Sequence, residues 1–203
     1  MSLAIISIVI LIFSVILHEV SHGYAAEVLG DPTARLSGRL TLNPLPHIDI
    51  MGSIVLPALF VLTGSPVVFG WAKPVPYNPV NIRGTAWKDR YGGALVAAAG
   101  PAVNILLAVI FGVLIRFNVF DPVMIQFFLT VVIINISLAV FNLIPIPPLD
   151  GHHILAALLP YDLRQKYMEL YRYSFILMFI VAFVLWQFVS PAVLFLVKII
   201  VGM

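Results

Sequence analysis

Residues 1–17, MSLAIISIVILIFSVIL, contain no charged side chain, and several later segments are comparably long and apolar. A transmembrane helix needs about 20 consecutive apolar residues. It is one of the few structures that satisfy every backbone N–H and C=O group within the hydrocarbon region. The composition agrees, because 62% of the residues are hydrophobic and only 10% are charged, whereas soluble domains carry about 25% charged residues. We therefore expect an all-α polytopic protein of the cell membrane, in contact with the lipid bilayer along most of its surface.

The apolar runs predict five transmembrane helices, or six if the C-terminal segment folds back. We expect one domain over residues 1–203, with helices at about 3–29, 50–69, 91–116, 123–144 and 173–198. The first helix follows no basic segment and precedes no small-residue cleavage signal, so we expect it to be retained and not removed as a signal peptide. Leu36, Leu40 and Leu42 share one parity, which predicts a short β-hairpin or a re-entrant segment after the first helix.

The charges limit the possible partners. The net charge of +2 gives no indication of a nucleic-acid partner, and the absence of cysteine excludes disulfides and thiolate ligands. With five crossings, most Lys and Arg residues would lie on the N-terminal side, which the positive-inside rule places in the cytoplasm. That count changes if residues 31–90 are partly re-entrant. The sequence therefore leaves both the orientation and the oligomeric state open.

The motif HEVSH, residues 18–22, directly follows the uncharged stretch. His18 and His22 are four residues apart, so on a helix both imidazoles can reach one metal ion. Glu19 lies beside them, where it can accept a proton from water activated by that metal, which is the arrangement of H-E-x-x-H zinc hydrolases. A purely structural polar cluster is the alternative. Ionisable groups are costly within a membrane, and a zinc ion would compensate that cost.

A catalytic zinc ion usually has three protein ligands and one open position. The remaining acids and histidines in apolar surroundings are few: His47, Asp49, Asp150, His152 and His153. Asp150 stands out because three prolines interrupt the fourth apolar run just before it, and irregular backbone at membrane depth is tolerated where it lines a cavity. The alternative for Asp150 is an N-cap of the helix that follows.

HEVSH in the first span and PPLDG late in the chain together resemble the site-2 protease family of intramembrane zinc metalloproteases. Further motifs of that family recur along most of the chain: NPLPHIDIMGSIVLP at 43–57, GWAKPVPYNP at 70–79 and AGPAVN at 99–104. One departure is Ile50, where the family pattern has proline. This difference affects a loop and not the metal chemistry.

The resemblance implies that His18, His22 and Asp150 bind one zinc ion and that Glu19 is the general base. It also implies regulated intramembrane proteolysis, the hydrolysis of peptide bonds within or near transmembrane segments of other membrane proteins. A site within the bilayer is consistent with such substrates. Two other classes remain as alternatives: a transporter or metal channel with an intramembrane ion path, and an inactive scaffold that binds transmembrane partners.

Two further residues are candidates for contact with the substrate. Asn104 lies one turn after Pro101, which loosens its helix, and its amide could bind the substrate backbone or stabilise an oxyanion. Bridging between helices is the alternative for Asn104. His47 could contact substrate, or it could be a loop histidine bonded to backbone. We expect His152 and His153 to lie around the metal ligand and not to act directly.

Overall fold

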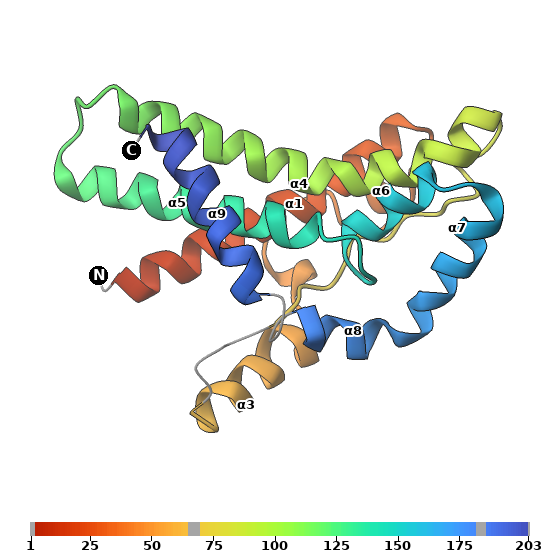
Figure 1. Cartoon of the computed structure of the whole chain (residues 1–203), viewed down its shortest axis with the longest axis horizontal. Helices are drawn as coiled ribbons and strands as arrows, with labels where there is room; N and C mark the ends of the chain where they lie inside the picture. The colour runs from red at the N-terminus through yellow and green to blue at the C-terminus, as the bar shows by residue number, and fades with distance from the viewer. Residues whose placement is uncertain (1–2, 65–69, 182–185, 203) are drawn as a thin grey trace.

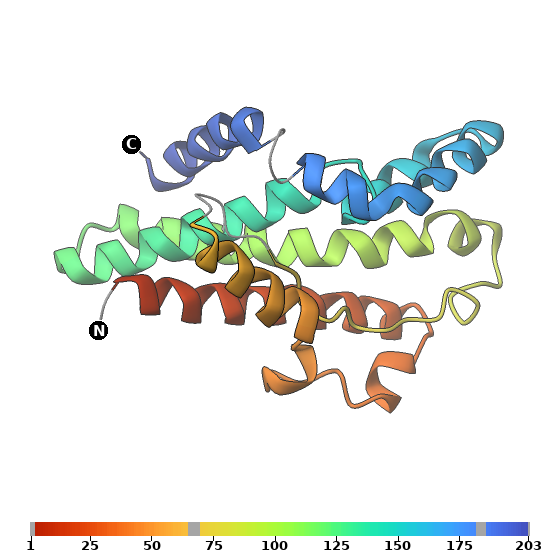
Figure 2. The ribbon, with the colours of Figure 1, turned by 90° about the horizontal axis from the view of Figure 1, so that it is seen from below.

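The computed structural model describes residues 3–64, 70–181 and 186–202. Three helices, α1 (Leu3–Val28), α4 (Ala86–Arg116) and α5 (Pro122–Asn142), run along the long axis of the molecule (Figures 1 and 2). Each is long and apolar enough to cross a membrane. The described residues are helical or irregular and contain no strand, which confirms the all-α prediction for this part of the chain.

The helices α1 and α4 are antiparallel neighbours. Lys88, near the start of α4, donates from Nζ to the carbonyl of Leu29 just past the end of α1, at 2.8 Å. Further along, Nδ1 of His22 lies 2.7 Å from the carbonyl of Val96, and Asn104 contacts Ser14. The segment between the two helices, residues 29–85, therefore begins and ends at the same end of the bundle.

The ends of the long helices follow from local sequence. Thr85 caps α4 by accepting from the backbone N–H of Lys88, and Asp121 caps α5 by accepting from Val123 and Met124. Such side-chain acceptors satisfy N–H groups that have no partner inside the helix. Prolines at 145, 147 and 148 follow the end of α5 and prevent its continuation, after which α6 (Asp150–Leu158) begins.

The segment after α1 does not form the β-hairpin, which was one of the two structures predicted for it. Instead of a β-hairpin it forms α2 (Thr33–Leu36), a 3-10 turn η1 (Leu45–His47), a π-helix η2 (Ile50–Val55) and α3 (Leu56–Leu62). The three leucines do not share one buried face, because Leu36 is 81% exposed and Leu42 is 55% exposed while Leu40 is half-buried. The alternation predicted a strand, but the described residues contain no second strand with which this segment could pair. Of the helix expected at 50–69, residues 65–69 lie outside the described residues.

The C-terminal part contains α7 (Tyr161–Met168), η3 (Glu169–Tyr173), α8 (Ser174–Ile180) and α9 (Trp186–Val201). The span expected at 173–198 thus corresponds to α8 and α9, and residues 182–185 between them lie outside the described part. Helix α9 packs on α4 and α5 through Ala108, Val132 and Val197. The first turn of α1 and the last turn of α9 lie near the same end of the molecule (Figure 1).

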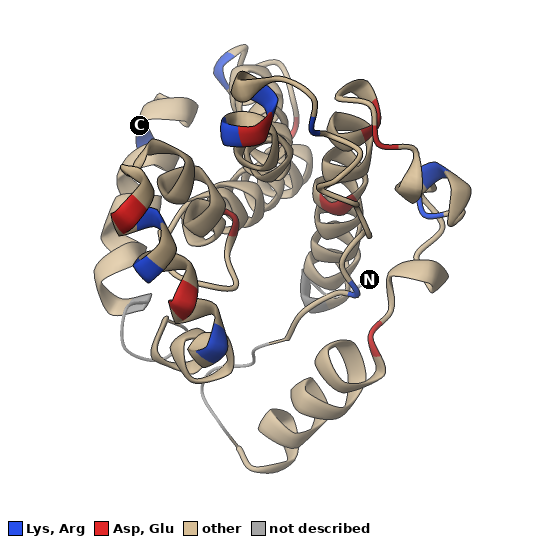
Figure 3. Ribbon diagram, turned by 90° about the vertical axis from the view of Figure 1, so that its right-hand side faces the viewer, with Lys and Arg blue, Asp and Glu red and all other residues tan. Residues whose placement is uncertain are grey.

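The charged residues are concentrated at the opposite end, which faces the viewer in Figure 3. Of the 11 Lys and Arg residues, Arg116 and Lys198 lie at the end that holds the N-terminus, where Arg116 donates to the carbonyls of Ile199 and Ile200. The other basic residues all lie in segments after α1, at the start of α4 or after α5: Arg35, Arg39, Lys73, Arg83, Lys88, Arg90, Arg164, Lys166 and Arg172.

Candidate metal centre

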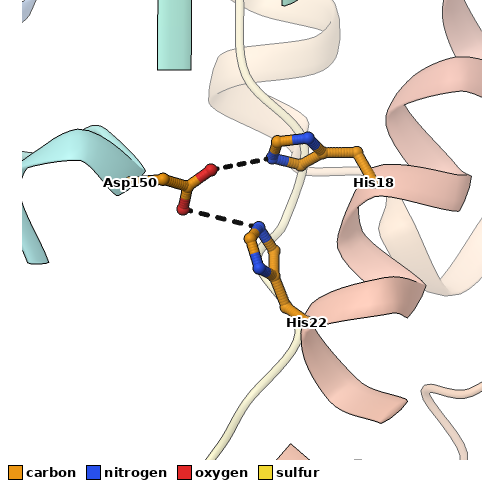
Figure 4. A group of neighbouring side chains, drawn as sticks. All are labelled: His18, His22 and Asp150. Atoms are coloured by element: carbon orange, nitrogen blue, oxygen red, sulfur yellow. Dashed lines mark ion pairs between the residues drawn. The ribbon is translucent and has the colours of Figure 1, made fainter. Parts of the chain in front are cut away.

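The site is built where α1 faces the start of α6. His18 and His22 project from adjacent turns of α1, and the carboxylate of Asp150 projects toward both imidazoles (Figure 4). Nε2 of His18 lies 3.2 Å from Oδ2 of Asp150, and Nε2 of His22 lies 3.4 Å from Oδ1. One ligand atom from each residue falls within 4.8 Å of the others. Residues from both halves of the chain therefore converge on one point.

Asp150 does not serve as a helix cap. The helix α6 begins at Asp150 itself, its N-cap position is Leu149, and no side chain caps it. Gly151 allows this placement, because a Cβ there would overlap the carbonyls of Leu143 and Ile144. The break after α5 therefore presses the first turn of α6 against the end of α5 and leaves the Asp150 carboxylate facing α1.

The hydrogen bonds of the two imidazoles orient them toward Asp150. Nδ1 of His18 lies 2.6 Å from Oδ1 of Asn104, and Nδ1 of His22 lies 2.7 Å from the carbonyl of Val96. Both partners accept hydrogen bonds, so each Nδ1 donates its proton and each Nε2 is the ring nitrogen that faces the carboxylate. Metal-binding histidines commonly donate their other ring N–H in this way.

A cation fits between these groups. Both Nε2 atoms face the Asp150 carboxylate, and Oδ2 of Asp150 is buried with no hydrogen-bond partner among the described residues. Zinc bonds of about 2.0–2.2 Å in tetrahedral geometry place neighbouring ligand atoms roughly 3.3–3.6 Å apart, which is close to the two distances from Asp150. Two imidazoles and one carboxylate also match the ligand set of catalytic zinc sites.

Gly100 on α4 makes room for both imidazoles. A Cβ at this position would lie 2.5 Å from Cε1 of His18 and from Nε2 of His22, closer than such atoms approach in proteins. The glycine of the AGPAVN motif therefore leaves space on the surface of α4 for the two imidazoles. Helix α4 nevertheless continues through Pro101.

Glu19 contacts a segment that the sequence analysis treated only as a loop. Its Oε2 accepts a hydrogen bond from the backbone N–H of Val75 at 2.9 Å. Val75 lies in the irregular segment 70–78. Arg39 holds this segment by donating from Nη2 to the carbonyls of Lys73 and Pro74, at 2.8 and 3.2 Å. Gly23 permits the close approach, since a Cβ there would lie 2.9 Å from the side chain of Val75.

Asn104 and His47, the two candidates for substrate contact, are both buried and bonded to groups of the protein. Asn104 is 0% exposed and is bonded to His18 and Asn135, an arrangement that matches the helix-bridging alternative. His47 is 3% exposed, and its Nε2 lies 3.0 Å from the carbonyl of Thr41, as expected for a loop histidine bonded to backbone.

Three further polar residues, His152, His153 and Asn135, lie near the site. His152 is fully buried and packs against Tyr167, with ring centroids 4.4 Å apart, while the half-buried His153 packs on Tyr171. The sequence analysis missed Asn135, which is 0% exposed on α5. An asparagine near the middle of a predominantly apolar run was the available signal.

Three apolar helices long enough to cross a membrane, with a cluster of two histidines and one carboxylate that could hold a metal ion, are the features expected of a membrane-associated metalloprotease. The model of peptidase family M50 matches residues 117–186, which include Asp150. YwhC of Bacillus subtilis, described as a zinc metalloprotease, is 40% identical over 186 residues, covering 87% of this chain and 79% of that protein. The chain belongs to peptidase family M50, the site-2 protease family, and is a zinc-dependent protease. The resemblance seen in the sequence is thereby confirmed.

Two other relatives are longer than this chain. Rip2 of Mycolicibacterium smegmatis is 34% identical over 147 residues, which are 71% of this chain and 53% of that protein. Rip2 of Mycobacterium tuberculosis is 33% identical over 145 residues, which are 70% of this chain and 52% of that protein. The chain thus spans about half of each Rip2 protein. No solved structure matches it.

Proposed function

We propose that this protein cleaves peptide bonds within or near the transmembrane segments of other membrane proteins, as in regulated intramembrane proteolysis. In this proposal His18, His22 and Asp150 hold one zinc ion and Glu19 is the general base. The observation that carries it is the convergence of two Nε2 atoms and one carboxylate on a membrane-length helix.

A bound zinc ion would supply Lewis acidity, polarising the scissile carbonyl and making water reactive near neutral pH. The residues of the chain do the rest. Glu19 accepts a proton from the attacking water and returns it to the leaving amine. The N–H of Val75 holds the Glu19 carboxylate at one oxygen, Oε2, and so limits its rotation.

The depth of the site supports a transmembrane substrate. His18 lies about 22 Å along α1 from residue 3, counting ~1.5 Å per residue, so the centre is well inside a helix that can cross the bilayer. A peptide bond that reaches it must come from a segment within or near the membrane. Such a segment must unwind locally, because a helix shields its own amide groups.

We further propose that the protein is a multi-pass protein of the cell membrane with its N-terminus outside the cytoplasm. The antiparallel packing of α1 and α4 places the start and the end of the segment between them, residues 29 and 85, at one end of the bundle, which favours the re-entrant alternative. All basic residues except Arg116 and Lys198 lie in segments attached to that end. The positive-inside rule therefore assigns that end to the cytoplasm, which reverses the orientation that five crossings implied.

The proposed activity is tested with purified protein in detergent and a single-span substrate. Cleavage should be blocked by a zinc chelator and by Glu19→Gln, and the Glu19→Gln protein should keep its zinc. Glu27→Gln is the matched control, because Glu27 lies on the same helix and pairs with Arg35 at the surface. Cleavage that persists at the wild-type rate in Glu19→Gln would refute the assigned role of Glu19.

A further inference from the structure

A chain of buried amide groups connects α5 to the imidazole of His18. Nδ2 of Asn135 donates to the carbonyl of Val131 at 2.9 Å and to Oγ of Ser14 at 3.0 Å. Oδ1 of Asn135 accepts from Nδ2 of Asn104 at 2.8 Å, and Oδ1 of Asn104 lies 2.6 Å from Nδ1 of His18. The chain thus links the three long helices through side chains that are at most 6% exposed.

The direction of these hydrogen bonds is set at the Val131 end. A backbone carbonyl can only accept, so the Asn135 amide must turn its NH₂ group toward Val131 and its oxygen toward Asn104. Asn104 must then present its own NH₂ group to Asn135, which leaves its oxygen facing His18. The carbonyl of Ser14, 3.5 Å from Nδ2 of Asn104, favours the same orientation.

We infer that Asn135 is a positioning residue for the metal centre, acting through Asn104 to fix the tautomer of His18. An oxygen at Nδ1 requires the ring proton there, and Nε2 is then left with a lone pair directed at Asp150 and the metal position. The inference rests on the proposed role of His18 as a ligand. It accounts for a polar residue, 0% exposed, within a predominantly apolar helix that is long enough to span a membrane.

The first test needs no substitution. In zinc-loaded protein labelled with ¹⁵N at histidine, the nitrogen chemical shifts report which ring nitrogen of His18 carries the proton and which binds the metal, and His18→Gln identifies the resonances. The inference predicts the Nδ1–H tautomer. A wild-type His18 found in the Nε2–H form would overturn it, whatever the outcome of any cleavage assay.

The second test removes Asn135. In Asn135→Leu the Asn104 amide loses the partner that sets its orientation and can turn its NH₂ group toward His18, which favours the Nε2–H tautomer. We expect this tautomer to appear and the zinc affinity to fall about 10-fold, as is typical when a group that orients a metal ligand is lost. Thr130→Val is the matched control on α5, because Thr130 donates only to Gln126 of its own helix.

A rescue variant separates this role from simple packing. In Asn104→Asp combined with Asn135→Leu, the carboxylate has no N–H group to present, so it can only accept from His18. The inference predicts that this double variant recovers the Nδ1–H tautomer and most of the zinc affinity. Zinc affinity of Asn135→Leu within twofold of wild type, or a double variant no better than Asn135→Leu, would contradict the inference. Failure of the wild type to bind zinc at all would instead refute the proposed function.

Discussion

The backbone N–H of Val75 donates to Oε2 of Glu19, which joins the segment 70–78 to the HEVSH motif. The buried Arg39 bonds to the same segment, because its guanidinium donates to the carbonyls of Lys73 and Pro74. The loop that follows α1 therefore determines where the side chain of Glu19 can lie. The sequence places these three segments far apart, and only the fold connects them.

Replacement of Arg39 should reduce the rate of the chemical step. In Arg39→Gln the segment 70–78 loses two hydrogen bonds, so the Val75 N–H shifts relative to Glu19. Small misplacements near a reacting group are costly, and we expect kcat to fall about 10-fold or more while KM and zinc content change little. Arg35→Gln is the control, because Arg35 is exposed on the neighbouring turn. An unchanged kcat in Arg39→Gln would show that the segment does not position Glu19.

Replacement of Gly100 should weaken metal binding. The added Cβ of Gly100→Ala would lie 2.5 Å from both imidazoles, so at least one must move away from Asp150. We expect the zinc affinity to fall about 10-fold or more, by analogy with the loss of other groups that orient metal ligands. Gly93→Ala on the same helix is the matched control, since a Cβ there comes no nearer than 3.9 Å to the hydroxyl of Tyr77. Equal zinc affinities in the two variants would contradict the close packing described at Gly100.

Asp31 should make the protein less stable in acid. Burial alone would raise the pKa of this carboxyl, but hydrogen bonds from Thr33, Asn81 and the N–H of Asn78 outweigh it and hold the pKa below its ordinary value. The unfolded chain, with a pKa of about 3.9, therefore binds the proton more readily than the folded protein. The contribution of Asp31 to stability is fully present above the unfolded pKa and is lost as the pH falls through the folded pKa.

The measurement is the free energy of unfolding in detergent across this pH range. Asp31→Asn should lower it by about 1–3 kcal/mol at neutral pH, because buried donors lose a charged acceptor, and should flatten its decline in acid. Asp162→Asn, on the exposed helix α7, serves as the control. A decline in acid that is as steep in Asp31→Asn as in the wild type would assign the acid sensitivity to other groups.

Local patterns predicted the parts of the site that lie on one helix. The four-residue spacing of His18 and His22 determines their common face wherever the helix packs, and the apolar runs predicted α1, α4 and α5 to within a few residues of their ends. The partners of Asn104 could not be predicted in this way. Whether its amide faces substrate or His18 depends on how α4 packs against α1 and α5, and no local pattern encodes that packing.

The predicted β-hairpin failed for a related reason. Alternation of Leu36, Leu40 and Leu42 indicates a strand only if another strand is available to pair with it, and the chain supplies none beside this segment within its described residues. The hydrogen bond from Val75 to Glu19 could not be predicted either. The Pro-rich sequence of residues 73–79 predicts an irregular loop, but it does not predict which part of the chain that loop contacts.

Zinc content of Asp150→Ala tests the central claim most directly. The account predicts one zinc ion per wild-type chain and a loss of at least 10-fold in affinity for Asp150→Ala, with Asp162→Ala indistinguishable from wild type. Both variants remove one carboxylate, but only Asp150 faces His18 and His22. Full zinc occupancy of Asp150→Ala at wild-type affinity would mean that the metal lies elsewhere, and the catalytic centre described above would be wrong.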